Sequence, residues 1–229
     1  MTVKEDKIEI TPIARIESDF GSKFGIPRQA GLVESLEARI VFEPEFRSEE
    51  ALRGIENYSH IWLIWQFSEN ADKGWKPTVR PPRLGGNARM GVFATRSPFR
   101  PNSLGLSCVR LSGIEKTETK GTVLKVAGAD LMNGTPIFDI KPYIPYSDCF
   151  PEAECGFAVR PEPTLEVTAD DEILQRIPPE KREALREVLA NDPRPAYQRE
   201  AGRVYGLRFA GHDVRFSVED RTLTVLEIQ

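Results

Sequence analysis

Short runs in which hydrophobic and polar residues alternate fill the first 150 positions of the chain, and Gly, Pro or Asn separate the runs. Alternation of this kind, in runs rich in β-branched and aromatic residues, predicts strands with one buried face. The predicted strands are Lys7–Ile16, Ala38–Phe42, Ser59–Phe67, Arg89–Thr95, Leu104–Leu111, Thr122–Ala127 and Ile137–Lys141. Several short strands at this spacing favour a β-barrel, whose single closed sheet leaves no exposed edges.

A brief helix is predicted just before the Ser59–Phe67 strand. Ser48 is a suitable N-cap residue, and Glu49 and Glu50 place negative charge where a helix N-terminus favours it. We therefore expect a short helix over Ser48–Gly54.

The pattern changes after Pro151. A proline-containing connection, Glu152–Glu166, leads to the clearest helix of the chain, Glu180–Leu189, which follows two prolines and carries an apolar stripe. The segment DPRPAY at Asp192–Tyr197 ends this helix. Three further strands are predicted, Arg203–Phe209, Asp213–Val218 and Thr222–Ile228. We therefore expect a mainly β protein, with a single-sheet β-barrel domain over residues 1–155 and a small α+β domain over residues 156–229.

Length and composition exclude several classes of protein. The chain has 229 residues, with 31 Lys and Arg against 35 Asp and Glu, for a net charge of −4. A chain of this length buries a core without disulfide or metal staples. Its N-terminus is highly charged, and no apolar run approaches the ~20 residues of a membrane-spanning helix. We expect a cytoplasmic protein with no membrane segment.

Residues for metal and nucleotide chemistry of the common kinds are scarce. The three cysteines form no C-x-x-C pair, the chain has two histidines, and no H-E-x-x-H helix or calcium loop occurs. The glycine-rich motifs of Rossmann folds and P-loops do not occur either. We expect no metal site, and we expect Cys108 in the core.

The charge is unevenly distributed along the chain. From Lys73 to Arg110 there is no acid, and the local charge is +8, which leaves −12 for the rest. The cations are Lys73, Lys76, Arg80, Arg83, Arg89, Arg96, Arg100 and Arg110, with Trp75, Phe93 and Phe99 among them. Arginine forks bind phosphates and aromatic rings stack on bases, so the segment is a candidate nucleic-acid surface. The alternative is a solvated loop whose cations pair with acids elsewhere.

Within this segment, Pro81–Leu106 is rich in glycine and proline. Pro98 and Pro101 fix the backbone around Arg96 and Arg100, which gives a stiff turn carrying two guanidinium groups. Such a turn can hold an anion. The alternative is a proline-rich connection whose arginines only cover neighbouring carbonyls.

Five segments together resemble one protein family. They are PRQAG at Pro27–Gly31, HIWLIWQF at His60–Phe67, GVFATRSPFRPNSLGLS at Gly91–Ser107, DLMNGTPIFDIKPY at Asp130–Tyr143 and DPRPAY at Asp192–Tyr197. In order and spread they resemble the TsaA/YaeB-like family of TrmO-type tRNA methyltransferases over nearly the whole chain. The resemblance implies a single-sheet β-barrel enzyme that works as a homodimer. It also implies transfer of a methyl group from S-adenosylmethionine to N6 of threonylcarbamoyladenosine at position 37 of tRNA, next to the anticodon.

The resemblance also implies the cofactor contacts. These are Pro27, Arg28, Gln29, His60, Ile61, Arg96, Leu106, Asp130, Leu131, Met132 and Asn133. Three of them have ordinary structural alternatives: Arg28 as a surface ion pair, His60 as a satisfied core residue, and Asp130 as a cap for Gly134. Asn133 departs from the family, because many relatives have an acid at this position, so an electrostatic role there is in doubt.

The chemistry of the acceptor indicates which further groups are needed. Methyl transfer requires alignment of nitrogen, methyl carbon and sulfur. The acceptor nitrogen is urea-like, so its proton must be removed as the bond forms. DPRPAY supplies Asp192 or Tyr197 for that proton transfer, and Arg194 for the threonyl carboxylate or a phosphate. The alternative is that DPRPAY only ends a helix and packs a small core.

Phe99 and Arg100 are the next candidates for tRNA contact, although both could equally face the cofactor. The C-terminal domain is a candidate for tRNA binding, and Trp62 and Trp65 are expected in the core or in the dimer interface. Two other functions stay open at this stage: a non-catalytic RNA-binding barrel, and a regulatory protein that senses S-adenosylmethionine.

Overall fold

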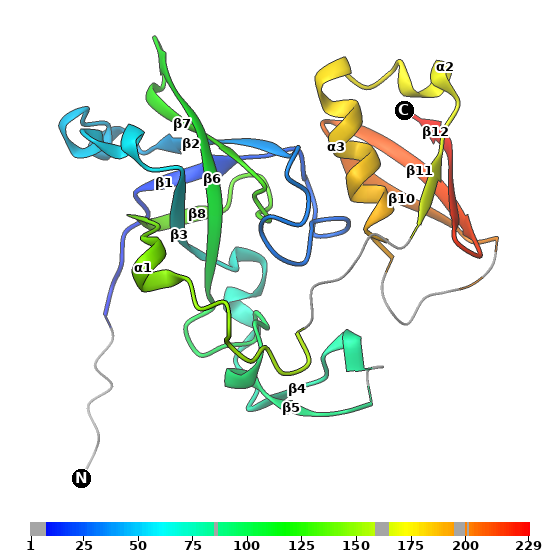
Figure 1. Cartoon of the computed structure of the whole chain (residues 1–229), viewed down its shortest axis with the longest axis horizontal. Coiled ribbons are helices and arrows are strands. Elements are labelled where there is room, and N and C mark those ends of the chain that lie inside the picture. Colours follow the sequence, from blue (N-terminus) through cyan, green and yellow to red (C-terminus); the bar gives the residue numbers. More distant parts are fainter. Residues whose placement is uncertain (1–7, 85–86, 159–164, 195–199, 201) are drawn as a thin grey trace.

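The computed structural model describes residues 8–84, 87–158, 165–194, 200 and 202–229. Figure 1 shows two bodies, a β-sheet body formed by the N-terminal part and a smaller body of sheet and helix at the C-terminus. Among the described residues, none of the helices is long and apolar enough to cross a membrane.

The N-terminal body is built on six strands. They are β1 (Ala14–Glu17), β2 (Glu37–Phe42), β3 (His60–Gln66), β6 (Leu104–Thr117), β7 (Gly121–Ala127) and β8 (Pro136–Pro142). Every pairing is antiparallel, and the order β1-β2-β7-β6-β3-β8 closes through the pairing of β8 with β1. Alternation along β3 buries Ile61, Leu63 and Trp65 in the interior, because successive side chains of a strand point to opposite faces.

One pairing shapes the end of this barrel where the cavity described below lies. Trp65 of β3 lies opposite Gly105 of β6. A Cβ at Gly105 would lie 2.4 Å from Cε2 of Trp65, so only glycine lets the indole lie across β6. Trp65 also packs edge-on against Phe67, with ring centroids 4.3 Å apart.

Short elements connect the barrel strands. The 3-10 helices are η1 (Pro44–Phe46), η2 (Glu50–Leu52), η3 (Ile55–Asn57), η4 (Ser68–Lys73), η5 (Pro82–Leu84) and η6 (Val92–Ala94). The others are the two-residue strands β4 (Thr78–Val79) and β5 (Met90–Gly91) and the single turn α1 (Pro145–Asp148).

Three local predictions differ from the structure. The strand predicted over Lys7–Ile16 is limited, among the described residues, to β1 at Ala14–Glu17. Over Ser48–Gly54 the predicted helix is only the three-residue 3-10 helix η2, and its N-cap residue is Glu49 without a side-chain cap rather than Ser48. Over Arg89–Thr95 the strand is limited to β5 and then turns into η6. Here Arg100 donates to the carbonyl oxygens of Val92 and Thr95, at 3.2 and 2.6 Å, so these groups do not take part in a strand ladder.

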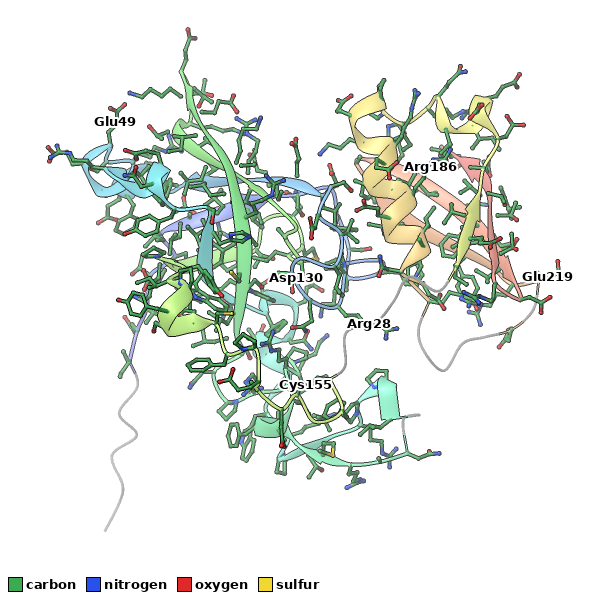
Figure 2. All side chains as sticks on the ribbon, viewed as in Figure 1. Arg28, Glu49, Asp130, Cys155, Arg186 and Glu219 are labelled. Carbon is green, nitrogen blue, oxygen red and sulfur yellow. The ribbon has the colours of Figure 1, made fainter. Side chains whose placement is uncertain are left out.

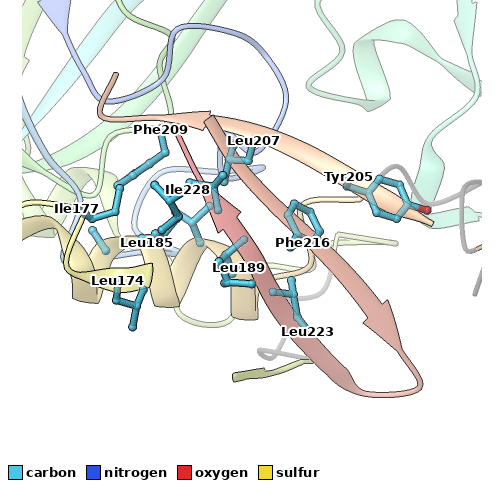
Figure 3. Close-up of a cluster of buried hydrophobic side chains, with 14 of the residues drawn as sticks. Leu174, Ile177, Leu185, Leu189, Tyr205, Leu207, Phe209, Phe216, Leu223 and Ile228 are labelled. Carbon is cyan, nitrogen blue, oxygen red and sulfur yellow. The ribbon is translucent and has the colours of Figure 1, made fainter. Parts of the chain in front are cut away.

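The C-terminal body is a four-stranded sheet covered by a helix. Its elements are β9 (Glu166–Thr168), α2 (Asp171–Leu174), α3 (Pro179–Ala190), β10 (Val204–Phe209), β11 (His212–Glu219) and β12 (Thr222–Ile228). The strand order is β10-β11-β12-β9, and Figure 3 shows Leu185 and Leu189 of α3 against Phe216 and Ile228 of the sheet. The predicted helix over Glu180–Leu189 and the mainly β character of the chain are confirmed.

A segment of the N-terminal part, residues 18–36, folds onto the C-terminal body. Phe20, Val33 and Leu36 are buried in the same hydrophobic cluster as Phe209 and Leu207. The segment is also tied by polar contacts, since Lys181 Nζ lies 2.7 Å from Asp19 Oδ2, Ser35 Oγ donates to Glu187 Oε2 at 2.7 Å, and the Ala210 N–H donates to the Asp19 carbonyl at 2.9 Å. The two bodies are therefore joined through this segment.

Candidate functional site

A cavity of about 410 Å³ lies where β3 ends and β6 begins. Its walls come from four places in the sequence: the 18–36 segment, the end of β3 with η4, the turn before β6 with the start of β6, and the loop after β7. The lining residues are Lys23, Ile26, Pro27, Arg28, Gln29, Trp65, Gln66, Phe67, Ser68, Glu69, Asn70, Thr95, Arg96, Pro98, Arg100, Leu104, Gly105, Leu106, Asp130, Met132 and Thr135.

The cavity combines charges of both signs with an apolar surface. Arg28 and Arg96 supply positive charge, Glu69 and Asp130 supply negative charge, and Figure 2 labels Arg28 and Asp130. Arg96 Nη1 donates to the side-chain oxygen of Gln29, which joins the turn before β6 to the 18–36 segment. A site of this volume and composition suits a zwitterionic ligand with an aromatic part.

Asp130 is a carboxyl group of the cavity whose pKa is shifted by its surroundings. Burial raises the pKa of Asp130 above its ordinary range. Four contacts favour the ionised form and oppose this effect: the Ser107 hydroxyl, which donates at 2.6 Å, the backbone N–H groups of Asp130 and Ala30, and the charge of Arg96. The result is a carboxyl group whose charge depends closely on its immediate partners.

Lys23 was missed by the sequence reasoning. Its ammonium lines the cavity and donates to Oδ1 of Asn70, which is itself buried. Burial and then the charge of Lys73 lower the pKa of Lys23, whereas Glu69 raises it. No motif marks Lys23 or Glu69 in the sequence, and their closeness to the PRQAG and WQF segments is the only signal that points to them.

A larger basic groove of about 1010 Å³ adjoins the cavity. The two share Arg28, Gln29, Thr95, Arg96 and Pro98. Among the described residues that line the groove there are five cations and no acid. The cations are Arg28, Lys76, Arg80, Arg89 and Arg96.

Aromatic rings accompany the charge. Phe99 and Phe157 line the groove, and the ammonium of Lys76 lies 4.8 Å from the Phe99 ring centroid. Arg100 lies in the cavity, and its two backbone contacts hold the turn of η6. The structure thus places Phe99 in the basic groove and Arg100 in the lining of the cavity.

Asp192 and Arg194 lie outside the cavity but next to it. Asp192 lines a recess of about 60 Å³ that shares Ile26, Pro27 and Arg28 with the cavity. Its two carboxylate oxygens accept from Nε and Nη2 of Arg194 at 2.8 and 3.0 Å, and Arg194 is only 9% exposed. The Asp192 hydrogen bond raises the pKa of Arg194. Tyr197 lies outside the described residues.

Four of the predicted cofactor contacts are not brought to this cavity. Ile61 and Leu131 are fully buried in the barrel core. His60 lies at the opposite end of β3, five residues of ~3.3 Å each or about 17 Å before Trp65, where it contacts Ser59 and Tyr143. The side chain of Asn133 accepts from the Ser18 N–H at 3.1 Å, which ties the loop after β7 to the segment after β1.

The described residues hold no group of three or more His, Cys, Asp and Glu side chains that could bind a metal ion. The polar side chains that line the cavity are guanidinium, ammonium, amide, carboxylate and hydroxyl groups.

Comparison with known proteins gives matches along most of the chain. Residues 15–149 match the family described as tRNA-methyltransferase O N-terminal domain, and residues 158–229 match the TrmO C-terminal domain. The chain is 41% identical over 226 residues to the Escherichia coli (strain K12) tRNA (adenine(37)-N6)-methyltransferase, covering 95% of this chain and 96% of that protein.

Two further similarities extend this result. The chain is 42% identical over 215 residues to a putative S-adenosylmethionine-dependent methyltransferase of Pseudomonas aeruginosa, covering 90% of this chain and 91% of the other. Its fold is similar to the crystal structure of TrmO from Pseudomonas aeruginosa, with a TM-score of 0.80 and 34% identity over 99% of this chain and 100% of that one.

Proposed function

The chain belongs to the TrmO family of tRNA methyltransferases, and from this premise we propose its reaction and the place where it occurs. The protein is an S-adenosylmethionine-dependent methyltransferase of adenine 37 in tRNA. We propose that the adenine it methylates carries a threonylcarbamoyl group. One observation carries the proposal: the cavity opens beside the basic groove, and the two share Arg28, Gln29 and Arg96.

The cavity suits S-adenosylmethionine. Its volume falls within the range of about 300–1,000 Å³ that small-molecule sites occupy. Arg28 and Arg96 are placed to hold an α-carboxylate, and Asp130 to accept from an ammonium or a ribose hydroxyl. Leu106 adds apolar surface for the adenine.

The groove suits the tRNA. When bound, S-adenosylmethionine supplies an electrophilic methyl group, so the protein has to bring the acceptor nitrogen into line with it. Arg80 and Arg89 line the groove but not the cavity, so they can bind phosphates along the groove. Phe99 offers a ring on which a base can stack. The shared residues mark the point at which the acceptor base would meet the methyl group.

The roles in DPRPAY follow from the contacts of Arg194. Both oxygens of Asp192 are engaged by Arg194, so we propose that Asp192 positions this guanidinium beside the segment that carries Arg28. Arg194 would then bind the threonyl carboxylate or a nearby phosphate. The sequence offers Asp192 or Tyr197 for removal of the N6 proton, and since Asp192 is engaged by Arg194 we propose Tyr197 for this role.

We also propose that the enzyme works as a homodimer in the cytoplasm, where its tRNA substrate is found. The outer face of the barrel beside the cavity carries Ile64 of β3 and Leu106 of β6, and Leu106 is 52% exposed although it lines the cavity. An apolar face next to a binding site is typical of an interface.

Nucleoside mass spectrometry tests the reaction. The protein is incubated with S-adenosylmethionine and two tRNA preparations, one with and one without the threonylcarbamoyl group at adenine 37. We expect the methyl group only on threonylcarbamoyladenosine. Methylation of the unmodified adenine would refute the proposed substrate, and methylation of neither tRNA would favour an RNA-binding or cofactor-sensing protein.

A further inference from the structure

A chain of two hydrogen bonds runs from the barrel interior into the cavity. Nε1 of Trp65 donates to Oγ of Ser107 at 3.0 Å, and Oγ of Ser107 donates to Oδ1 of Asp130 at 2.6 Å. Trp65 is 7% exposed and Ser107 is 3% exposed, so water has little access to either contact. Asp130, at the end of this chain, lines the cavity.

The direction of these bonds is fixed by chemistry. An indole N–H only donates, so the oxygen of Ser107 must accept from Trp65. The one proton of the Ser107 hydroxyl is then left for Asp130, and a carboxyl group that receives a hydrogen bond is favoured in its ionised form. Without the indole N–H, the Ser107 hydroxyl could rotate and accept a hydrogen bond from a neutral Asp130 instead.

The backbone holds this arrangement in place. Gly105 lies opposite Trp65, and the absence of a Cβ there lets the indole cross β6 to reach Ser107, two residues further along the strand. Gly105 and Ser107 point to the same face of β6, because side-chain direction repeats every two residues. The geometry therefore requires Trp65, Gly105 and Ser107 together.

We propose that Trp65 is a positioning residue for the cofactor: acting through Ser107, it holds the Asp130 side chain as a hydrogen-bond acceptor that faces the cavity. The inference rests on the proposed function, because it takes the cavity to be the S-adenosylmethionine site. Trp65 itself takes no part in methyl transfer. Its effect is on the pH range over which the cavity can bind a donor group of the cofactor.

The sign of the pH dependence follows from the carboxyl group. An ionised Asp130 accepts from the cofactor and a neutral one competes as a donor, so affinity falls as the pH drops through the Asp130 titration. The other charged groups that line the cavity are Lys23, Arg28, Glu69, Arg96 and Arg100. Glu69 is the only other carboxyl group among the described residues that line the cavity.

The test is the dissociation constant of S-adenosylmethionine, measured by calorimetry from about pH 4.5 to pH 8 for the full chain and its variants. Trp65→Phe removes the indole N–H. Trp62→Phe is the matched control, because Trp62 also donates to a carboxylate, Asp148 at 2.9 Å, but on the outer face of β3 and outside the lining of the cavity. The series is repeated with Glu69→Gln, which removes the other acid of the cavity.

For Trp65→Phe we expect the midpoint of the affinity curve to move up by about one pH unit, since a hydrogen bond to a charged group is worth at least about tenfold in an equilibrium. At a pH below the midpoint, this shift makes the dissociation constant of S-adenosylmethionine about tenfold larger. At pH 8 the affinity should stay close to that of the unaltered protein. The same shift should appear in the Glu69→Gln background, and Trp62→Phe should leave the midpoint unchanged.

Ser107→Ala provides an independent variant. It should move the midpoint at least as far as Trp65→Phe, and the double variant should match Ser107→Ala alone, because Trp65 acts through the hydroxyl. Equal weakening at every pH, or an equal shift in Trp62→Phe, would overturn the inference. If the unaltered protein binds no S-adenosylmethionine at any pH, the proposed function itself fails, which is a different result.

Discussion

Substitution of Gly25 tests the link between the C-terminal body and the cavity that we propose as the cofactor site. It lies two residues before Pro27, has a φ of +88°, and a Cβ on it would be 2.2 Å from Cδ1 of Leu207. Leu207 is 1% exposed in the C-terminal core, so it has little room to move. Gly25→Ala therefore combines a left-handed backbone cost of about 1–2 kcal/mol with an overpacking cost of about 1–3 kcal/mol.

Gly31→Ala separates the two costs. Gly31 has a φ of +75° in the same segment, but a Cβ there would meet nothing within 4 Å. Its substitution should cost only the backbone part, about 1–2 kcal/mol. The difference of about 1–3 kcal/mol should put the thermal unfolding midpoint of Gly25→Ala roughly 2–12 °C below that of Gly31→Ala.

Thermal unfolding and titration with S-adenosylmethionine provide the assay. We expect Gly25→Ala to weaken cofactor binding more than Gly31→Ala at a temperature where both variants are folded, because the clash displaces the segment that carries Pro27 and Arg28. Equal unfolding midpoints and equal affinities for the two variants would refute the reasoning.

Three further predictions concern charge. Changing Arg80 and Arg89 together to Ala should weaken tRNA binding. The slope of log affinity against log salt concentration should become shallower by roughly 0.7 for each phosphate that is no longer neutralised. Calorimetry should show unchanged S-adenosylmethionine binding. Asp192→Asn leaves the nearly buried Arg194 poorly paired and should lower stability by about 1–3 kcal/mol in thermal unfolding, and unchanged stability would show that the pair is not needed. Burial raises the pKa of Asp130 in the folded protein. The stability that the neutral carboxyl group contributes is therefore largest below the unfolded-state pKa of ~3.9, and it is lost as the pH rises through the pKa of Asp130 in the folded protein. Asp130→Asn should therefore be at least as stable as the unaltered protein at pH 7 while binding the cofactor more weakly, and a clear loss of stability there would contradict this sign.

The alternation of side chains predicts most of the β-sheet structure, because one buried face is all that such a strand requires. It works for β3, whose Ile61, Leu63 and Trp65 are buried in turn. It fails over Arg89–Thr95, because nothing in a local pattern shows that Arg100 will occupy two backbone carbonyls of that segment. β9 was missed as well, since three residues pairing in parallel with β12 leave no periodic signal.

The site could be predicted in part. The matched motifs contain Arg28, Arg96, Leu106 and Asp130, and the structure brings these together at one cavity although they are far apart in the sequence. His60 belongs to a matched motif but starts β3, whereas the cavity lies where β3 ends. Tertiary structure decides which end of a strand lies at the cavity, so the sequence alone could not exclude His60 from the cofactor site.

Calorimetric titration of the full chain with S-adenosylmethionine tests the central claim that this cavity is the cofactor site. The account predicts that the unaltered protein binds, that Arg96→Ala binds at least about tenfold more weakly because a charge-assisted hydrogen bond to the cofactor is removed, and that Arg110→Ala binds normally. Arg110 is a fair control, because it belongs to the same basic segment but lines neither the cavity nor the groove. Equal affinity of the two variants, or no binding by the unaltered protein, would contradict the account.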